Sequence, residues 1–120
     1  MIRPNLLVWQ WSDYAAKHRD RVNLLLHLVA VPLFQAGTLI LVVGVSIRSA
    51  LGIGIALACL AAAVLIERRG HARERETPAP FDGPLDFASR FVAEQWITFP
   101  RFVLSGAWRR NFRATAVGSA

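Results

Sequence analysis

Two long apolar stretches, residues 22–47 and 50–66, follow each other with only Arg48 and Ser49 between them. A hydrocarbon core about 30 Å thick requires roughly 20 residues of α-helix, with about 17 as the lower limit. The first stretch exceeds this length and the second meets the minimum. Because the connection is so short, the second helix must run back beside the first. The sequence therefore predicts an all-α integral membrane protein built on a helical hairpin, with a buried hairpin in a soluble protein as the alternative.

The distribution of positive charge orients this hairpin. The formal net charge is +6, and the basic residues lie mainly before and after the hairpin, whereas only Arg48 lies in its turn. Lys and Arg are enriched in cytoplasmic segments, and near a membrane each contributes about 1 kcal/mol of attraction to anionic lipids. We therefore expect a multi-pass protein of the bacterial inner membrane, with both termini cytoplasmic, membrane lipid as a partner and no nucleic acid.

The flanking segments complete a single membrane domain. Residues 5–18, with three aromatic side chains, predict an interfacial helix at headgroup depth. Transmembrane helices at 21–47 and 50–66 are followed by a polar, proline-rich loop at 67–83. The predicted C-terminal helical region, 84–109, is apolar but interrupted by Pro100, so that an in-plane or re-entrant helix is favoured over a full crossing. Residues 110–120 are predicted to form a tail.

The three histidines of the chain are His18, His27 and His71. Two precede or begin the first span and one follows the second, so a hairpin returns all three to the same membrane face. In one unbroken helix His18 and His27 would point in opposite directions. Asp20 is a plausible N-cap that would break the helix between them. Singly each histidine is more typical of a solvated or structural residue, whereas together they predict a site for a first-row metal ion.

Three further polar residues are candidate catalytic residues. Asn23 lies four residues before His27 and shares its helix face. Glu74 is a candidate ligand, or a hydrogen-bond partner of a ligating imidazole. Glu94 lies in an apolar segment, where a carboxylate is costly unless it faces an arginine or the metal site.

Two spaced motifs include all three histidines. The first has the form Tyr, then His-x4-Asn-x3-His-x4-Pro, and here reads Tyr14, His18, Asn23, His27 and Pro32. The second has the form Gly-His, then Glu and Pro-Ala, and here reads Gly70, His71, Glu74, Pro78 and Ala79. With these motifs the sequence resembles the Mpo1-like family of membrane proteins. The resemblance covers about residues 9–108, and within it the stretch at 94–103 is similar to the end of the shorter bacterial members.

The resemblance implies an iron(II)-dependent dioxygenase that shortens 2-hydroxy fatty acids by one carbon, with O2 as the second substrate. It implies His18, His27 and His71 as the iron ligands. We further expect the acyl chain to lie between the helices and Arg21 or Arg69 to hold the substrate carboxylate. A non-catalytic membrane interaction or scaffold protein is the alternative, and in either case the chain is a candidate homo-oligomer.

Overall fold

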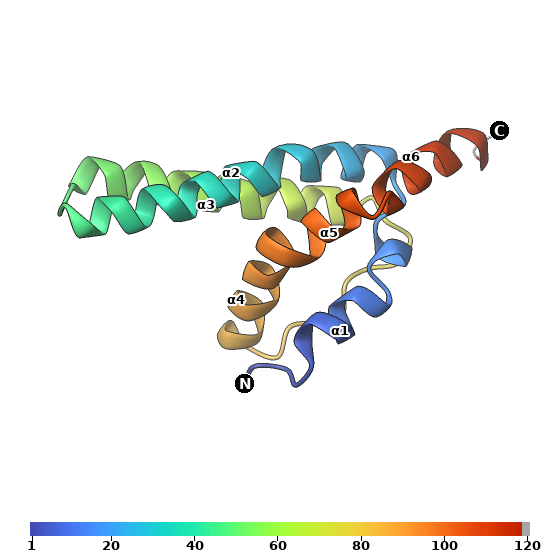
Figure 1. Cartoon of the computed structure of the whole chain (residues 1–120), viewed down its shortest axis with the longest axis horizontal. Coiled ribbons are helices and arrows are strands. Elements are labelled where there is room, and N and C mark those ends of the chain that lie inside the picture. The colour runs from blue at the N-terminus through green and yellow to red at the C-terminus, as the bar shows by residue number, and fades with distance from the viewer. Residues whose placement is uncertain (119–120) are drawn as a thin grey trace.

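The computed structural model describes the backbone of residues 1–118 and the side chains of residues 1–114. The described residues form helices and no strand, so the predicted all-α fold is confirmed. The largest part of the structure is a hairpin of two antiparallel helices, α2 (Arg21–Ser46) and α3 (Ala50–His71), which form a long rod (Figure 1).

Side-chain caps define both helices of the hairpin. The Asp20 carboxylate accepts a hydrogen bond from the backbone N–H of Asn23 at 2.9 Å and thereby caps α2, as the sequence predicted. Ser49 caps α3 by accepting from the N–H of Gly52 at 3.0 Å. Between the helices Arg48 adopts a left-handed conformation with φ of 55°, which allows the chain to reverse within three residues, 47–49.

The two hairpin helices pack closely along small residues. A Cβ atom added at Gly37 would lie 3.0 Å from the Cβ of Cys59, and one added at Gly44 would lie 3.1 Å from the backbone nitrogen of Ile53. Such contacts are closer than side chains normally allow, so glycine is what permits this approach. At these two positions the helices of the hairpin are too close for an acyl chain to lie between them.

The outer surface of the hairpin is apolar and exposed. In their most apolar windows only 28% of α2 and 17% of α3 is buried, whereas a core helix of a soluble protein is mostly buried. Large side chains such as Leu39, Val42, Leu51, Leu57 and Leu65 are more than half exposed. Among the described residues, α2 and α3 are therefore the helices that are long and apolar enough to cross a membrane.

The remaining helices gather at the open end of the hairpin (Figure 1). The side chain of Gln10 donates to the carbonyl of Arg90 at 2.9 Å and joins the N-terminal helix to the C-terminal segment. Trp108 Nε1 donates to the carbonyl of Leu24 at 3.1 Å and fixes the last helix against α2. These helices are α1 (Leu6–Ser12), the 3₁₀ turn η1 (Ala15–Lys17), α4 (Pro84–Ala93), the π-helix η2 (Glu94–Thr98), α5 (Phe99–Leu104) and α6 (Ala107–Gly118).

Three predicted boundaries need correction. The interfacial helix predicted at 5–18 is the short α1 followed by η1. The loop predicted at 67–83 begins only after His71, because α3 continues through its charged last turn, where basic residues interact favourably with the helix C-terminus. The tail predicted at 110–120 is helical to Gly118, and residues 119–120 lie outside the described residues.

Pro100 does not separate the C-terminal segment into two pieces as the sequence suggested. It lies in the first turn of α5, where its missing N–H is tolerated. The π-helix η2 ends directly before α5, and its wider turn lies just before Pro100. The actual break comes at Ser105 and Gly106, where Gly106 has a positive φ of 84° that favours glycine.

Candidate metal centre

The three histidines meet at the open end of the hairpin. The distance between ring centroids is 4.9 Å from His18 to His27, 4.8 Å from His18 to His71 and 5.0 Å from His27 to His71. His18 follows η1, His27 lies in the second turn of α2, and His71 is the last residue of α3. The helix break capped by Asp20 lets His18 turn back toward His27. The convergence predicted from the hairpin topology is therefore present.

Glu94 completes this group from the C-terminal segment. Its Oε2 atom lies 3.4 Å from Nε2 of both His18 and His27. One potential ligand atom from each of Glu94 and the three histidines falls within a cluster whose members are all within 4.8 Å of one another. Glu94 is the first residue of the π-helix η2, and π-turns are frequent at functional sites. We call His18, His27, His71 and Glu94 the tetrad.

Whether a metal ion fits the tetrad depends on which imidazole nitrogens have no hydrogen-bond partner. His18 Nδ1 lies 2.7 Å from the carbonyl of Tyr14, and His27 Nδ1 lies 3.0 Å from the carbonyl of Asn23. A carbonyl can only accept, so each Nδ1 carries the hydrogen and a neutral ring presents its Nε2 lone pair to the cluster. Nε2 of both rings and Nδ1 of His71 are buried without a hydrogen-bond partner among the described residues.

Buried polar atoms normally have partners, so three unpartnered nitrogens that face one carboxylate call for an explanation. Three imidazoles and a carboxylate are a donor set that suits a first-row divalent ion. The carbonyls behind His18 and His27 hold the ring tautomers in the way that outer hydrogen bonds do at metal sites. The residues of the tetrad therefore fit a metal ion.

Tyr14 is hydrogen-bonded to Glu94. Its hydroxyl donates to Glu94 Oε2 at 2.6 Å, and both side chains are buried. Burial and the adjacent Glu94 carboxylate raise the pKa of Tyr14 well above its usual value, so the phenol remains a donor. Burial raises the pKa of Glu94, but in the form in which His18 and His27 are protonated at both ring nitrogens their Nε2–H groups and positive charge outweigh burial and hold the pKa of Glu94 well below its usual range.

A second carboxylate, Glu67, lies behind the tetrad. It is 1% exposed, and its Oε2 accepts from Gln95 Nε2 at 3.0 Å and lies 3.9 Å from His27 Nε2. Functional roles for Tyr14, Glu67 and Gln95 were not predicted from the sequence. The available signal was the polar pair Glu94–Gln95 within an otherwise apolar segment, which indicates an inward-facing surface.

Glu74 and Asn23 do not face the tetrad as ligands. The Glu74 carboxylate accepts from the backbone N–H groups of Arg19 and Asp20 at 2.9–3.1 Å, and from Asn23 Nδ2 at 2.6 Å. Glu74 thus fixes the chain directly after His18 to the start of α2. The structure places both predicted residues in the support of the site, while Glu94 lies within the site.

We predict that Glu74→Gln loosens the segment that carries His18. The amide loses the negative charge and presents an NH2 group to backbone donors, so the stability should fall by about 2 kcal/mol. Thermal unfolding in detergent would measure this loss. Glu76→Gln is the matched control, because Glu76 is exposed and two residues away. Equal melting temperatures for the Glu74 variant and the native protein would contradict this role.

Neither predicted substrate arginine reaches the tetrad. The Arg21 guanidinium lies 4.0 Å from the ring centroid of Phe112, on which it stacks, and Arg69 is exposed. A cavity of about 520 Å³ adjoins the tetrad between α1, α3, α4 and the loop before α4, and neither arginine lines it. Three residues of the tetrad, namely His18, His71 and Glu94, contribute to its lining.

Comparison with known proteins supports the motif analysis. The profile of the family described as "2-hydroxy-palmitic acid dioxygenase Mpo1-like" matches residues 6–101, which contain the complete tetrad. No curated protein and no solved structure gave a significant match. Since the family match extends over most of the chain, this protein belongs to the Mpo1-like family.

Proposed function

We propose that the protein is a membrane-embedded, iron(II)-dependent dioxygenase that shortens 2-hydroxy fatty acids by one carbon. The observation that carries this proposal is the tetrad, in which three unpartnered imidazole nitrogens and one carboxylate face a common point. The description of the matched family supplies the reaction class and the substrate class. The donor set supports iron(II), because imidazole and carboxylate ligands that leave coordination positions open are typical of non-haem iron oxygenases.

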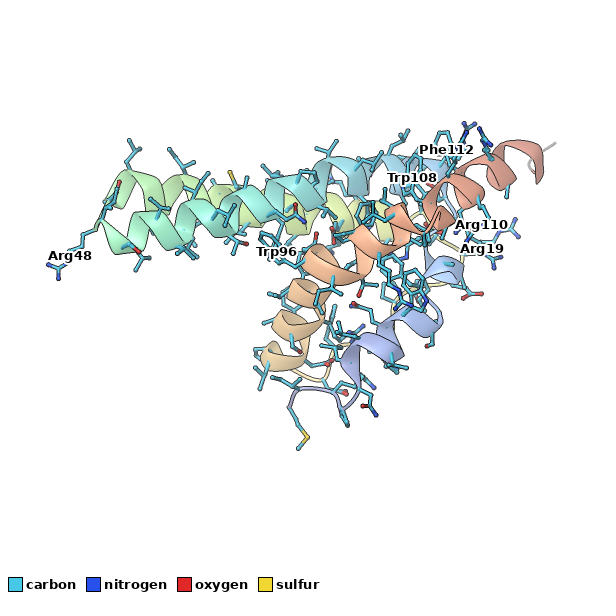
Figure 2. All side chains as sticks on the ribbon, viewed as in Figure 1. Arg19, Arg48, Trp96, Trp108, Arg110 and Phe112 are labelled. Atoms are coloured by element: carbon cyan, nitrogen blue, oxygen red, sulfur yellow. The ribbon has the colours of Figure 1, made fainter. Side chains whose placement is uncertain are left out.

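We place α2 and α3 across the bilayer with the tetrad near the cytoplasmic headgroups. Arg48 lies at the closed end of the rod, and Arg19 and Arg110 lie near its open end (Figure 2). His27 is six residues into α2, which at 1.5 Å per residue puts it only about 9 Å below the start of the helix. A 2-hydroxy fatty acid that partitions into this leaflet would meet the site at the depth of its own headgroup.

Some residues of the site would bind the metal ion, and others hold those ligands in position. A bound iron(II) ion would supply the redox chemistry that couples O2 to the 2-hydroxy acid. His18, His27, His71 and Glu94 would hold the ion. Tyr14 keeps Glu94 oriented through a hydrogen bond of 2.6 Å. Phe99 and Phe102, which are almost completely buried beside His27 and Tyr14, exclude water from the rear of the site.

The test is an oxygen-uptake assay on native protein purified gently in detergent and loaded with iron(II). Addition of 2-hydroxypalmitic acid should start O2 consumption, with one pentadecanoic acid, one CO2 and one water formed for each O2 consumed. Palmitic acid, which lacks the hydroxyl group, is the matched control and should not be shortened. An iron-loaded protein that consumes no O2 with 2-hydroxy acids of any chain length would contradict the proposed function and favour the scaffold alternative.

A further inference from the structure

The cavity beside the tetrad is lined by both aromatic and cationic residues. Its volume of about 520 Å³ lies within the range of roughly 300–1,000 Å³ that is typical of small-molecule sites. Trp9, Phe81, Phe87 and Phe91 contribute aromatic rings to its lining. This combination suits an amphipathic ligand with one acidic end and a long hydrocarbon tail.

Three cationic residues line the cavity, but two of them are already neutralised. Lys17 forms an ion pair with Asp13 at 2.7 Å. Arg90 pairs with Asp86 at 3.1 Å and also donates to the carbonyls of residues 79 and 80, so its guanidinium is committed to the fold. The third cation is Arg68. Its side chain has no ion pair, hydrogen bond or ring contact with any residue in the described part of the chain.

The position of Arg68 on α3 aims it at the same space as the metal centre. Val64, Glu67, Arg68 and His71 all line the cavity and have the spacing i, i+3, i+4, i+7 of a single helix face. Arg68 therefore lies one turn before His71 on that face. Arg69, the candidate from the sequence, lies about 100° further around the helix and outside the cavity lining.

We propose, on the basis of the proposed function, that Arg68 binds the carboxylate of the fatty-acid substrate. A guanidinium can hold a carboxylate through two parallel hydrogen bonds. The hydroxyl-bearing carbon is adjacent to the carboxylate, so it falls between Arg68 and the tetrad. The acyl tail extends along Phe87 and Phe91 toward the open side of the cavity. Arg68 is thus a substrate-binding residue, and the tail lies outside the hairpin.

The test measures binding of a ligand that does not react. The affinity for palmitic acid is measured at equilibrium for four iron-loaded proteins: the native protein, Arg68→Ala, Arg69→Ala and Arg75→Ala. Each variant loses one positive charge, so the comparison separates the local effect of Arg68 from the effect of net charge. Arg75 is exposed in the loop and does not line the cavity. Arg68→Ala should weaken binding at least about tenfold, as expected for a lost charge-assisted pair. The other two variants should stay within about twofold, and methyl palmitate should bind Arg68→Ala and the native protein equally.

Two results would overturn this assignment. One is an Arg69→Ala variant that loses as much affinity as Arg68→Ala or more, which would point to the face of α3 that does not line the cavity. The other is displacement of palmitic acid by phosphatidylglycerol at equal mole fraction, which would identify Arg68 as a lipid-headgroup contact. Because palmitic acid binding requires no turnover, Arg68-dependent binding without O2 uptake would refute the proposed function and leave this assignment standing.

Discussion

His71→Ala is expected to abolish tight metal binding and, with it, all oxygen uptake. Loss of an outer hydrogen-bond partner of a metal ligand typically costs 10–100-fold in affinity, so removal of a ligand itself should cost more than about 100-fold. His71 is the last residue of α3 and is partly exposed, so its truncation leaves the hairpin packing intact. Metal content by plasma emission spectrometry, measured after gel filtration, tests the prediction directly.

Chemical rescue distinguishes a lost ligand from a damaged fold. Imidazole added at millimolar concentration should enter the space left in His71→Ala and restore part of the metal binding, because that space opens to the cavity. An unchanged far-UV circular dichroism spectrum is the accompanying control. Full metal occupancy in His71→Ala without added imidazole would contradict the assignment of this residue as a ligand.

Gly70→Ala is expected to be the most destabilising single-methyl change in the hairpin. A Cβ atom at Gly70 would lie 2.1 Å from Oδ1 and 3.0 Å from Cγ of Asn23. Asn23 cannot move away cheaply, since it is completely buried and donates to Glu74 at 2.6 Å. Overpacking of this kind costs about 1–3 kcal/mol. Because Gly70 precedes His71 and Asn23 accepts from His27, metal affinity should fall together with the melting temperature.

Gly54→Ala is the matched control for this prediction. A Cβ at Gly54 meets nothing within 4 Å, so the substitution should be neutral or stabilise the helix by up to about 1 kcal/mol. Asn23→Ala adds a second control, because it removes the atoms that the new methyl group meets. Gly70→Ala should therefore cost much less in the Asn23→Ala background than in the native one. Equal costs in both backgrounds would contradict the proposed clash.

The hairpin and the convergence of histidines could be predicted from sequence because local features determine both. The connection formed by Arg48 and Ser49 is so short that the chain must reverse direction there. The Asp20 cap breaks the helix, so that His18 turns toward His27. Helix ends were less predictable. The charged residues after Ile66 resemble a loop in composition, yet α3 continues to His71 because Gly70 lets it pack tightly against Asn23.

The roles of Glu94 as fourth ligand and of Arg68 as substrate-binding arginine could not be predicted from the sequence, because both depend on tertiary structure. Glu74 is close to His71 in sequence and Glu94 is distant, but the return of the C-terminal segment brings Glu94 to the tetrad and leaves Glu74 on the backbone of Arg19 and Asp20. Arg68 and Arg69 are adjacent in sequence. The cavity that α1, α3 and α4 line together exists only in the folded chain, and Arg68 lines it whereas Arg69 does not.

The central claim, that the tetrad binds one iron ion, is tested most directly by X-ray absorption at the iron edge of the loaded native protein. We predict a spectrum with the multiple scattering of three imidazoles and one carboxylate oxygen in the nearest shell, at one iron per chain. Two imidazoles should remain in any iron bound by His71→Ala. A native spectrum without imidazole scattering, or with the same imidazole count in the variant, would contradict the account.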